Sequence, residues 1–67
     1  MHNYRLYFLG QPHGHIEGFE PIFALSDGLA MEAASRFRGP LHLELYWRAR
    51  KVGDIEAARR GGLDQEK

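Results

Sequence analysis

The sequence has no cysteine, so disulfide bonds and thiolate zinc sites are excluded. Its nine basic and nine acidic residues cancel, so it lacks the strongly basic composition that is typical of nucleic-acid-binding proteins. No apolar run approaches the roughly 18 residues needed to span a membrane, and the amino end lacks a basic-then-apolar signal sequence. We therefore expect a cytoplasmic protein with no membrane partner.

The length of 67 residues allows one small domain with a thin hydrophobic core. Hydrophobic residues make up 43% of the chain and aromatic residues 12%, a composition that excludes a disordered chain. We expect a single domain over residues 1–57 and a polar, flexible tail over residues 58–67. Without disulfides, a domain of this size gains stability most readily by self-association.

Two strands are expected in the first part of the chain. Residues 3–9 (NYRLYFL) have the length and the aromatic content of a strand. After a turn rich in glycine and proline, residues 15–24 return as an edge strand. This strand is expected to end near Glu20, because Gly18 favours a bulge and Pro21 cannot donate to a ladder. Ile22 and Phe23 are then expected to enter the core.

A helix is predicted from Ser26 or Asp27, either of which can cap it, to the stop at residues 39–40. Its apolar arc is expected to face the sheet and contains Leu29, Ala30, Ala33, Ala34 and Phe37. Residues 41–47 alternate as LHLELYW, which predicts a strand with its leucines and Trp47 under the helix. The chain then either makes a hairpin into a final strand at 51–55 or continues as one strand to residue 52.

These elements predict an α+β fold in the order β-β-α-β-β. Its antiparallel four-stranded sheet has the spatial order 2-1-3-4, with one helix on one face. An antiparallel sheet can leave its second face uncovered. The residues expected on that face are Arg5, Tyr7, Leu9, His42, Glu44 and Tyr46.

Three motifs resemble small uncharacterised bacterial proteins that begin YRxYFLDxxGHI and end in a segment such as VEVWxxxRRVxRL. They are YRLYFL near the start, the turn ending in Gly14-His15-Ile16, and the late segment LELYWRARKV. The layout is also similar to a broader bacterial domain of unknown function with ββαββ order. The resemblance extends over roughly residues 3–55. It implies a fold and a cytoplasmic setting, and no established activity.

Candidate chemistry in the sequence is sparse. His13 and His15 flank Gly14 and offer two imidazoles, but no third ligand at a metal-site spacing completes them, so we expect no metal and no cofactor. His42 and Glu44 share one strand face, where such a pair is more often a solvated cross-strand contact than a catalytic one. We therefore expect no catalytic residues and no enzymatic activity.

Two functions stay open. Seven basic residues between Arg36 and Arg60 oppose three acidic ones, a net of +4, and they lie near Tyr46 and Trp47, a combination that favours nucleic-acid binding as the alternative. The first hypothesis is a homodimeric protein-interaction module, with itself or another protein as partner, because the second sheet face is apolar. The residues predicted to bind a partner are Tyr7, Leu9, Tyr46, Trp47, Arg48 and Arg50.

Overall fold

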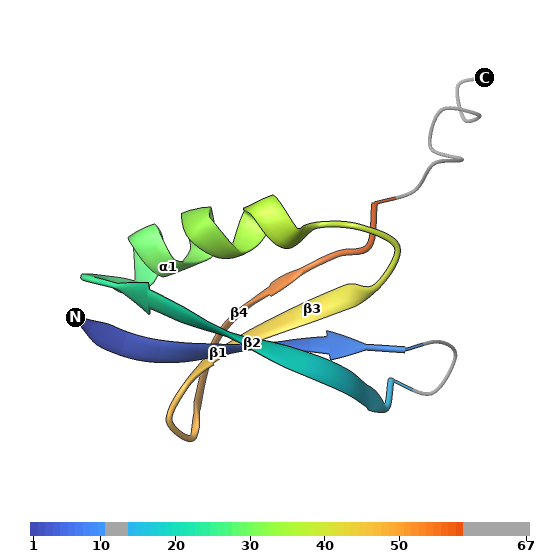
Figure 1. Ribbon diagram of the computed structural model, residues 1–67, viewed down its shortest axis with the longest axis horizontal. Coiled ribbons are helices and arrows are strands. Elements are labelled where there is room, and N and C mark those ends of the chain that lie inside the picture. Colours follow the sequence, from blue (N-terminus) through green and yellow to red (C-terminus); the bar gives the residue numbers. More distant parts are fainter. Residues whose placement is uncertain (11–13, 59–67) are drawn as a thin grey trace.

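Two β-hairpins flank one helix in the computed structural model, which describes residues 1–10 and 14–58 (Figure 1). The elements in chain order are β1 (His2–Leu9), β2 (Ile16–Ala24), α1 (Asp27–Ala34), the 3₁₀ turn η1 (Ser35–Phe37), β3 (His42–Trp47) and β4 (Arg50–Ile55). The strands are antiparallel and lie in the order β2-β1-β3-β4. This confirms the predicted α+β fold. The predicted tail lies, apart from residue 58, outside the described residues.

The second strand is longer than predicted. β2 does not end near Glu20 but continues through Pro21 to Ala24, because Pro21 lies on an edge strand where no outer neighbour needs its missing N–H. A register shift beside Gly18 confirms the expected bulge. Ile22 is buried as predicted, but Phe23 is 59% exposed. The prediction for Phe23 was wrong because strand alternation continues and turns its ring to the opposite face.

The helix is short and close to the sheet. Ser26 caps it, since its Oγ accepts a hydrogen bond from the backbone N–H of Leu29 at 3.2 Å. Ala30 and Ala34 are fully buried, whereas Leu29 and Phe37 are 48% and 40% exposed, so only part of the predicted apolar arc faces the core. In the described part of the chain, no helix is long and apolar enough to cross a membrane.

A tight turn joins β3 to β4, so the hairpin prediction is confirmed and the single long strand is excluded. Arg48, the first of the two turn residues, has φ 60°, and it is the only described non-glycine residue with a positive φ. Val52 is the extra residue of a bulge on β4. Gly53 lies against the side chain of Met31 on the helix, because a Cβ there would lie 3.0 Å from Met31 Sδ.

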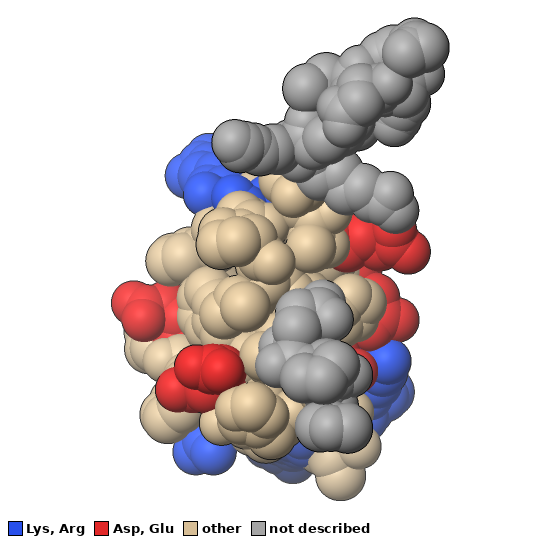
Figure 2. Space-filling view, turned by 90° about the vertical axis from the view of Figure 1, so that its right-hand side faces the viewer, with Lys and Arg blue, Asp and Glu red and all other residues tan. Residues whose placement is uncertain are grey.

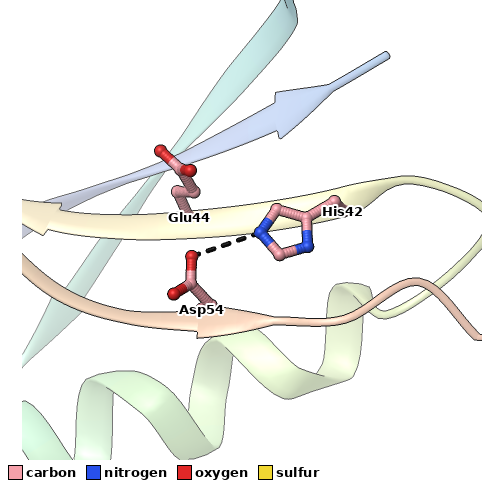
Figure 3. A group of neighbouring side chains, drawn as sticks. All are labelled: His42, Glu44 and Asp54. Atoms are coloured by element: carbon pink, nitrogen blue, oxygen red, sulfur yellow. Dashed lines mark hydrogen bonds and ion pairs between the residues drawn. The ribbon is translucent and has the colours of Figure 1, made fainter. Parts of the chain in front are cut away.

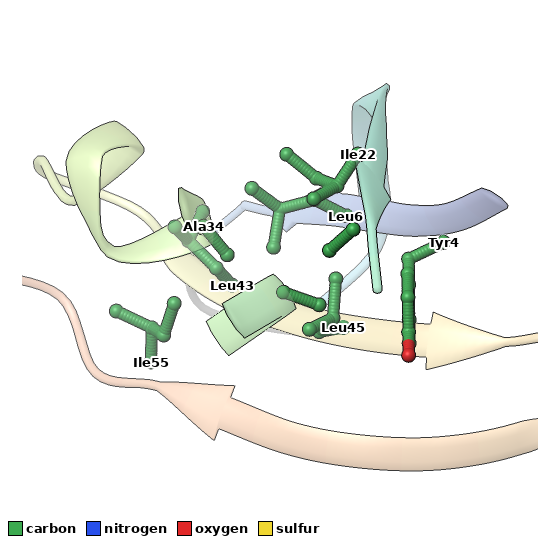
Figure 4. Packing of buried hydrophobic residues seen from close by; sticks show 9 residues of the cluster. Tyr4, Leu6, Ile22, Ala34, Leu43, Leu45 and Ile55 are labelled. Atoms are coloured by element: carbon green, nitrogen blue, oxygen red, sulfur yellow. The ribbon is translucent and has the colours of Figure 1, made fainter. Parts of the chain in front are cut away.

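The hydrophobic core fills the layer between α1 and the sheet (Figure 4). Its buried members come from all four strands and the helix: Tyr4, Leu6, Ile22, Ala24, Ala30, Ala34, Leu43, Leu45 and Ile55. Two of the predicted core leucines, Leu43 and Leu45, are fully buried, and Trp47 packs at the margin. The core is therefore one layer of side chains, and all of it lies on the helix side.

Replacing Arg48 by glycine tests the strain in the turn. An L-residue in the left-handed region costs about 1 kcal/mol, part of which the stacking of Arg48 on Trp47 offsets, so we expect Arg48→Gly to raise the free energy of unfolding by about 0.5 kcal/mol. Ala49→Gly, at a position without positive φ, is the matched control and should lower it by about 0.5–1 kcal/mol. Urea denaturation measures both. An Arg48→Gly protein less stable than the native one would contradict the assignment.

Candidate functional site on the uncovered face of the sheet

The face of the sheet opposite α1 has no covering element in the ranges that the structure describes (Figure 1). Strand register fixes which residues share this open face, because side chains directly opposite each other in an antiparallel pair point the same way. Across the middle of the sheet, Tyr7 lies between Phe19 and Glu44, and Asp54 follows Glu44. We call these four residues the acidic row.

A second row of side chains crosses the open face beside the first, two residues away along β1 and β3. Arg5 on β1 lies between Pro21 on β2 and Tyr46 on β3, and Lys51 on β4 follows Tyr46. We call these four residues the basic row. The two rows have the same layout, with apolar side chains at the β2 end and charged ones at the β4 end. They differ in the sign of the charge.

An aromatic cluster occupies the centre of the open face. The ring centroid of Tyr7 lies 6.1 Å from that of Phe19 and 5.6 Å from that of Tyr46. The Arg5 guanidinium carbon lies 5.1 Å from the centroid of Phe19, within the range of a cation–π contact. Phe19 is nevertheless 51% exposed. The cluster is ordered by its own contacts, yet a large part of its apolar surface stays in water.

The aromatic cluster borders a shallow hollow of about 440 Å³. Residues from three strands and both adjoining turns line it: Tyr7, Leu9, Gly14, Ile16, Glu44, Tyr46, Arg48 and Ala49. Its wall is mixed, with apolar side chains beside the Glu44 carboxylate and the Arg48 guanidinium.

Ionic contacts hold the β4 end of the open face. Lys51 Nζ lies 2.8 Å from Asp54 Oδ1 and 3.5 Å from Glu44 Oε2. His42 Nε2 lies 3.2 Å from the same Asp54 oxygen. The Lys51 ammonium lowers the pKa of Asp54, and the carboxylate of Asp54 in turn raises the pKa of Lys51. These groups are partly exposed, so each pair contributes little to stability by itself.

Three of these side chains have the chemistry of metal ligands. His42, Glu44 and Asp54 each place one ligand atom within 4.8 Å of the others, although His42 and Asp54 come from different strands (Figure 3). A divalent transition metal accepts one imidazole and two carboxylates. Here the Lys51 ammonium already contacts both carboxylates and balances their charge. We therefore interpret the group as an ionic network.

A separate polar cluster lies on the helix side, at the amino end of α1. Asp27 accepts a hydrogen bond from the Tyr4 hydroxyl at 2.8 Å and pairs with Arg50, whose Nη1 is 3.1 Å away. The Trp47 ring lies beside His2, with centroids 5.2 Å apart, and the Arg50 guanidinium stacks on it at 5.6 Å. The ion pair between Arg50 and Asp27 connects β4 to the amino end of α1. The hydrogen bond from Arg50 is the main reason that the pKa of Asp27 is lowered.

The residues predicted to bind a partner divide between these two places. The open face holds Tyr7, Leu9 and Tyr46, and the register confirms the full set expected there. Trp47 and Arg50 belong to the cluster on the helix side. Arg48 lies in the turn, lines the hollow of the open face and stacks on Trp47 at 5.0 Å.

Sequence reasoning missed the β2 contribution to the open face. Ile16, Phe19 and Phe23 lie there, and each is between 51% and 59% exposed. The signal was present, because these residues alternate with polar or core positions once the bulge beside Gly18 is counted. Ending the strand near Glu20 hid Phe23, and strict alternation without the bulge placed Ile16 and Phe19 on opposite faces. The open face is therefore considerably more apolar than predicted.

The basic residues do not gather into one patch among those described. Arg36 and Arg38 follow the carboxyl end of α1, whereas Arg50 pairs with Asp27 at its amino end. In the view of Figure 2, basic and acidic atoms both lie mainly around the margin of a surface that is largely uncharged. Three residues that entered the sequence hypotheses lie outside the described residues: His13, Arg59 and Arg60.

Comparisons of the chain with protein-family models, with curated proteins and with solved structures found no match. The resemblance to small bacterial proteins of the YRxYFLDxxGHI type therefore stays a prediction, as does the expectation that the protein is not an enzyme. No relative indicates a function, and the open face is the main feature of the described residues that bears on one.

The lowered pKa of Asp27 predicts a specific acid sensitivity. A carboxyl whose pKa is lower in the folded than in the unfolded chain stabilises the fold above its unfolded pKa of about 3.9, and this contribution is lost as the pH falls through the folded pKa. We expect Asp27→Asn to be less stable than the native protein at pH 7 and to lose less stability on acidification. Melting temperatures between pH 7 and pH 3 measure this.

The matched control is Glu32→Gln, which removes an exposed carboxylate from the same helix. Its melting temperature should fall between pH 7 and pH 3 by as much as that of the native protein. If the melting temperature of Asp27→Asn also fell by as much as that of the native protein, the ion pair with Arg50 would not contribute to folding.

Proposed function

We propose that this protein is a homodimeric, non-catalytic interaction module of the cytoplasm, and that a second copy of the chain covers the open face. The observation that carries the proposal is the exposure of Ile16, Phe19 and Phe23 beside the aromatic cluster. A monomer would leave this apolar surface in water at a cost of about 25 cal/mol per Å². A second copy is the partner that is always present at the same concentration.

Both edges of the sheet are poor sites for association. Pro21 interrupts β2, where an added strand would meet a position without an N–H donor. The other edge, β4, carries the bulge at Val52 and the charge of Lys51. Proline, bulges and lysine are the devices that prevent strands from pairing edge to edge. Association through the open face is therefore favoured over extension of the sheet.

The size of the open face fits this use. Four strands about 4.8 Å apart and about seven residues long project an area of roughly 450 Å². A standard protein interface takes about 800 Å² of accessible surface from each partner. Because side chains stand above the sheet and add to its accessible area, a stable dimer requires nearly the whole face, including its charged end.

One observation favours the alternative, nucleic-acid binding. The ring of Trp47 has the guanidinium groups of Arg48 and Arg50 stacked on it, at 5.0 and 5.6 Å. An aromatic ring between cations resembles a site for a nucleic-acid base. However, Arg50 is already paired with Asp27, which reduces its charge toward a phosphate. Quenching of the single tryptophan by a single-stranded oligonucleotide at low salt would favour this alternative.

Placing a charge in the aromatic cluster tests the dimer. We expect the native protein to be a dimer at micromolar concentration and Phe19→Glu to dissociate at least about ten times more readily, because a buried unpaired carboxylate is costly. Light scattering coupled to size exclusion measures the mass.

Leu29→Glu is the matched control, since Leu29 is 48% exposed but lies on the helix. It should remain a dimer. A native protein that is monomeric at all concentrations, or a Leu29→Glu protein that dissociates as Phe19→Glu does, would contradict association through the open face. Circular dichroism establishes that each variant is folded.

A further inference from the structure

We infer that the two copies are related by a twofold axis that runs across the strands, between the acidic row and the basic row, so that each row of one copy faces the opposite row of the other. This inference rests on the proposed homodimer and adds which residues meet. It follows from the register and the charges of the open face.

Two copies that meet through the same face are related by a twofold axis lying in the plane between the sheets. If the axis ran along the strands, β2 of one copy would face β3 or β4 of the other. Each row would then face itself, so Phe19 would lie on Glu44 or Asp54 and Pro21 on Tyr46 or Lys51. The ionic network would lose its water to apolar side chains and gain no partner from the second copy, so this direction is disfavoured. An axis across the strands instead places β2 on β2 and β4 on β4.

The position of the axis is also restricted. If it passed through the acidic row, Glu44 and Asp54 would each meet their own copy, and if it passed through the basic row, Arg5 and Lys51 would do so. Like charges placed opposite each other across an interface cost several kcal/mol. A position midway between the two rows avoids both repulsions, because opposite charges meet there.

At that position every facing pair is complementary. Lys51 of one copy faces Asp54 of the other, and both pairs form because the axis repeats the contact. Phe19 faces Pro21, and its exposed ring is covered. The remaining two facing pairs are Arg5 with Tyr7, a cation and a ring, and Tyr46 with Glu44, a hydroxyl donor and a carboxylate. Sheets that pack face to face keep their strands within about 30° of each other, which preserves these pairings near the axis.

The ionic network gains a second role in this arrangement. Within one copy, Lys51 already contacts Asp54 at 2.8 Å. In the dimer the two lysines and two aspartates alternate around the axis, so each ammonium lies between carboxylates of both copies. The network thus selects one orientation of the two sheets, while the aromatic cluster supplies most of the apolar contact.

A mixture of two variants tests the arrangement. In Lys51→Glu, the facing positions 51 and 54 are both acidic. In Asp54→Lys, both are basic. Each variant alone should therefore dissociate at least roughly ten-fold more readily than the native dimer. Mixed in equal amounts, they should form a heterodimer, because position 51 of the first faces position 54 of the second with opposite charge at both pairs. Light scattering and native mass spectrometry measure this.

In the mixture, positions 51 and 54 have opposite charges between the two copies but like charges within each copy. Formation of a heterodimer would therefore depend on the contacts between copies. A native dimer with a mixture that stays monomeric would overturn the arrangement and leave the proposed dimer standing. A monomeric native protein would overturn both.

A second measurement does not depend on reversed charges. The chain has no cysteine, so single-cysteine variants react at one place only. A mixture of Lys51→Cys and Asp54→Cys treated with a short bismaleimide should cross-link more than either variant alone. Equal cross-linking in the mixture and in each variant alone would contradict the placement of Lys51 opposite Asp54 of the second copy.

Discussion

One short helix must cover a four-stranded sheet, and it can cover only one side. The eight residues of α1 span about 12 Å, and two buried alanines, Ala30 and Ala34, let it lie close to the strands. The core that results is a single layer between helix and sheet. Among the described residues, no element covers the other side of the sheet, so the side chains on that side lie at the surface of a single chain.

The open face is divided by charge and by polarity in different directions. Along each row the side chains change from apolar on β2 to charged on β4, and between rows the sign of the charge reverses. A surface of this kind is self-complementary under a twofold rotation about an axis across the strands. In the proposed dimer, Glu44, Lys51 and Asp54, which form an ionic network within one copy, also contact the second copy.

The fold could be predicted from the sequence because its signals are local. Ser26 caps the helix, the leucines of β3 alternate, and the β3–β4 hairpin followed once a turn at Arg48 was allowed. The face was harder to predict. Adjacent residues such as Tyr46 and Trp47 point to opposite sides of the sheet, so their closeness in sequence suggested a joint surface that does not form.

The contribution of β2 and the ionic network depended on register, which the sequence does not give. Pro21 predicts the end of a strand, but an edge strand tolerates proline, so β2 continues and Phe23 reaches the open face. Phe19 shares that face with Ile16 only because of the bulge beside Gly18. Asp54 meets Glu44 only because the bulge at Val52 shifts β4 by one residue. Bulges and edge positions depend on the neighbouring strand, so local sequence patterns could not place these residues.

The central claim, that the open face is buried against a second copy, can be tested most directly on two phenylalanines. In a single chain Phe19 is 51% exposed and Phe37 on the helix side 40% exposed. A soluble paramagnetic probe added to the protein, followed by NMR of the two rings, measures their exposure in solution. At high protein concentration the account predicts strong relaxation of Phe37 and little of Phe19, with Phe19 becoming exposed on dilution. Equal or stronger relaxation of Phe19 at every concentration would contradict it.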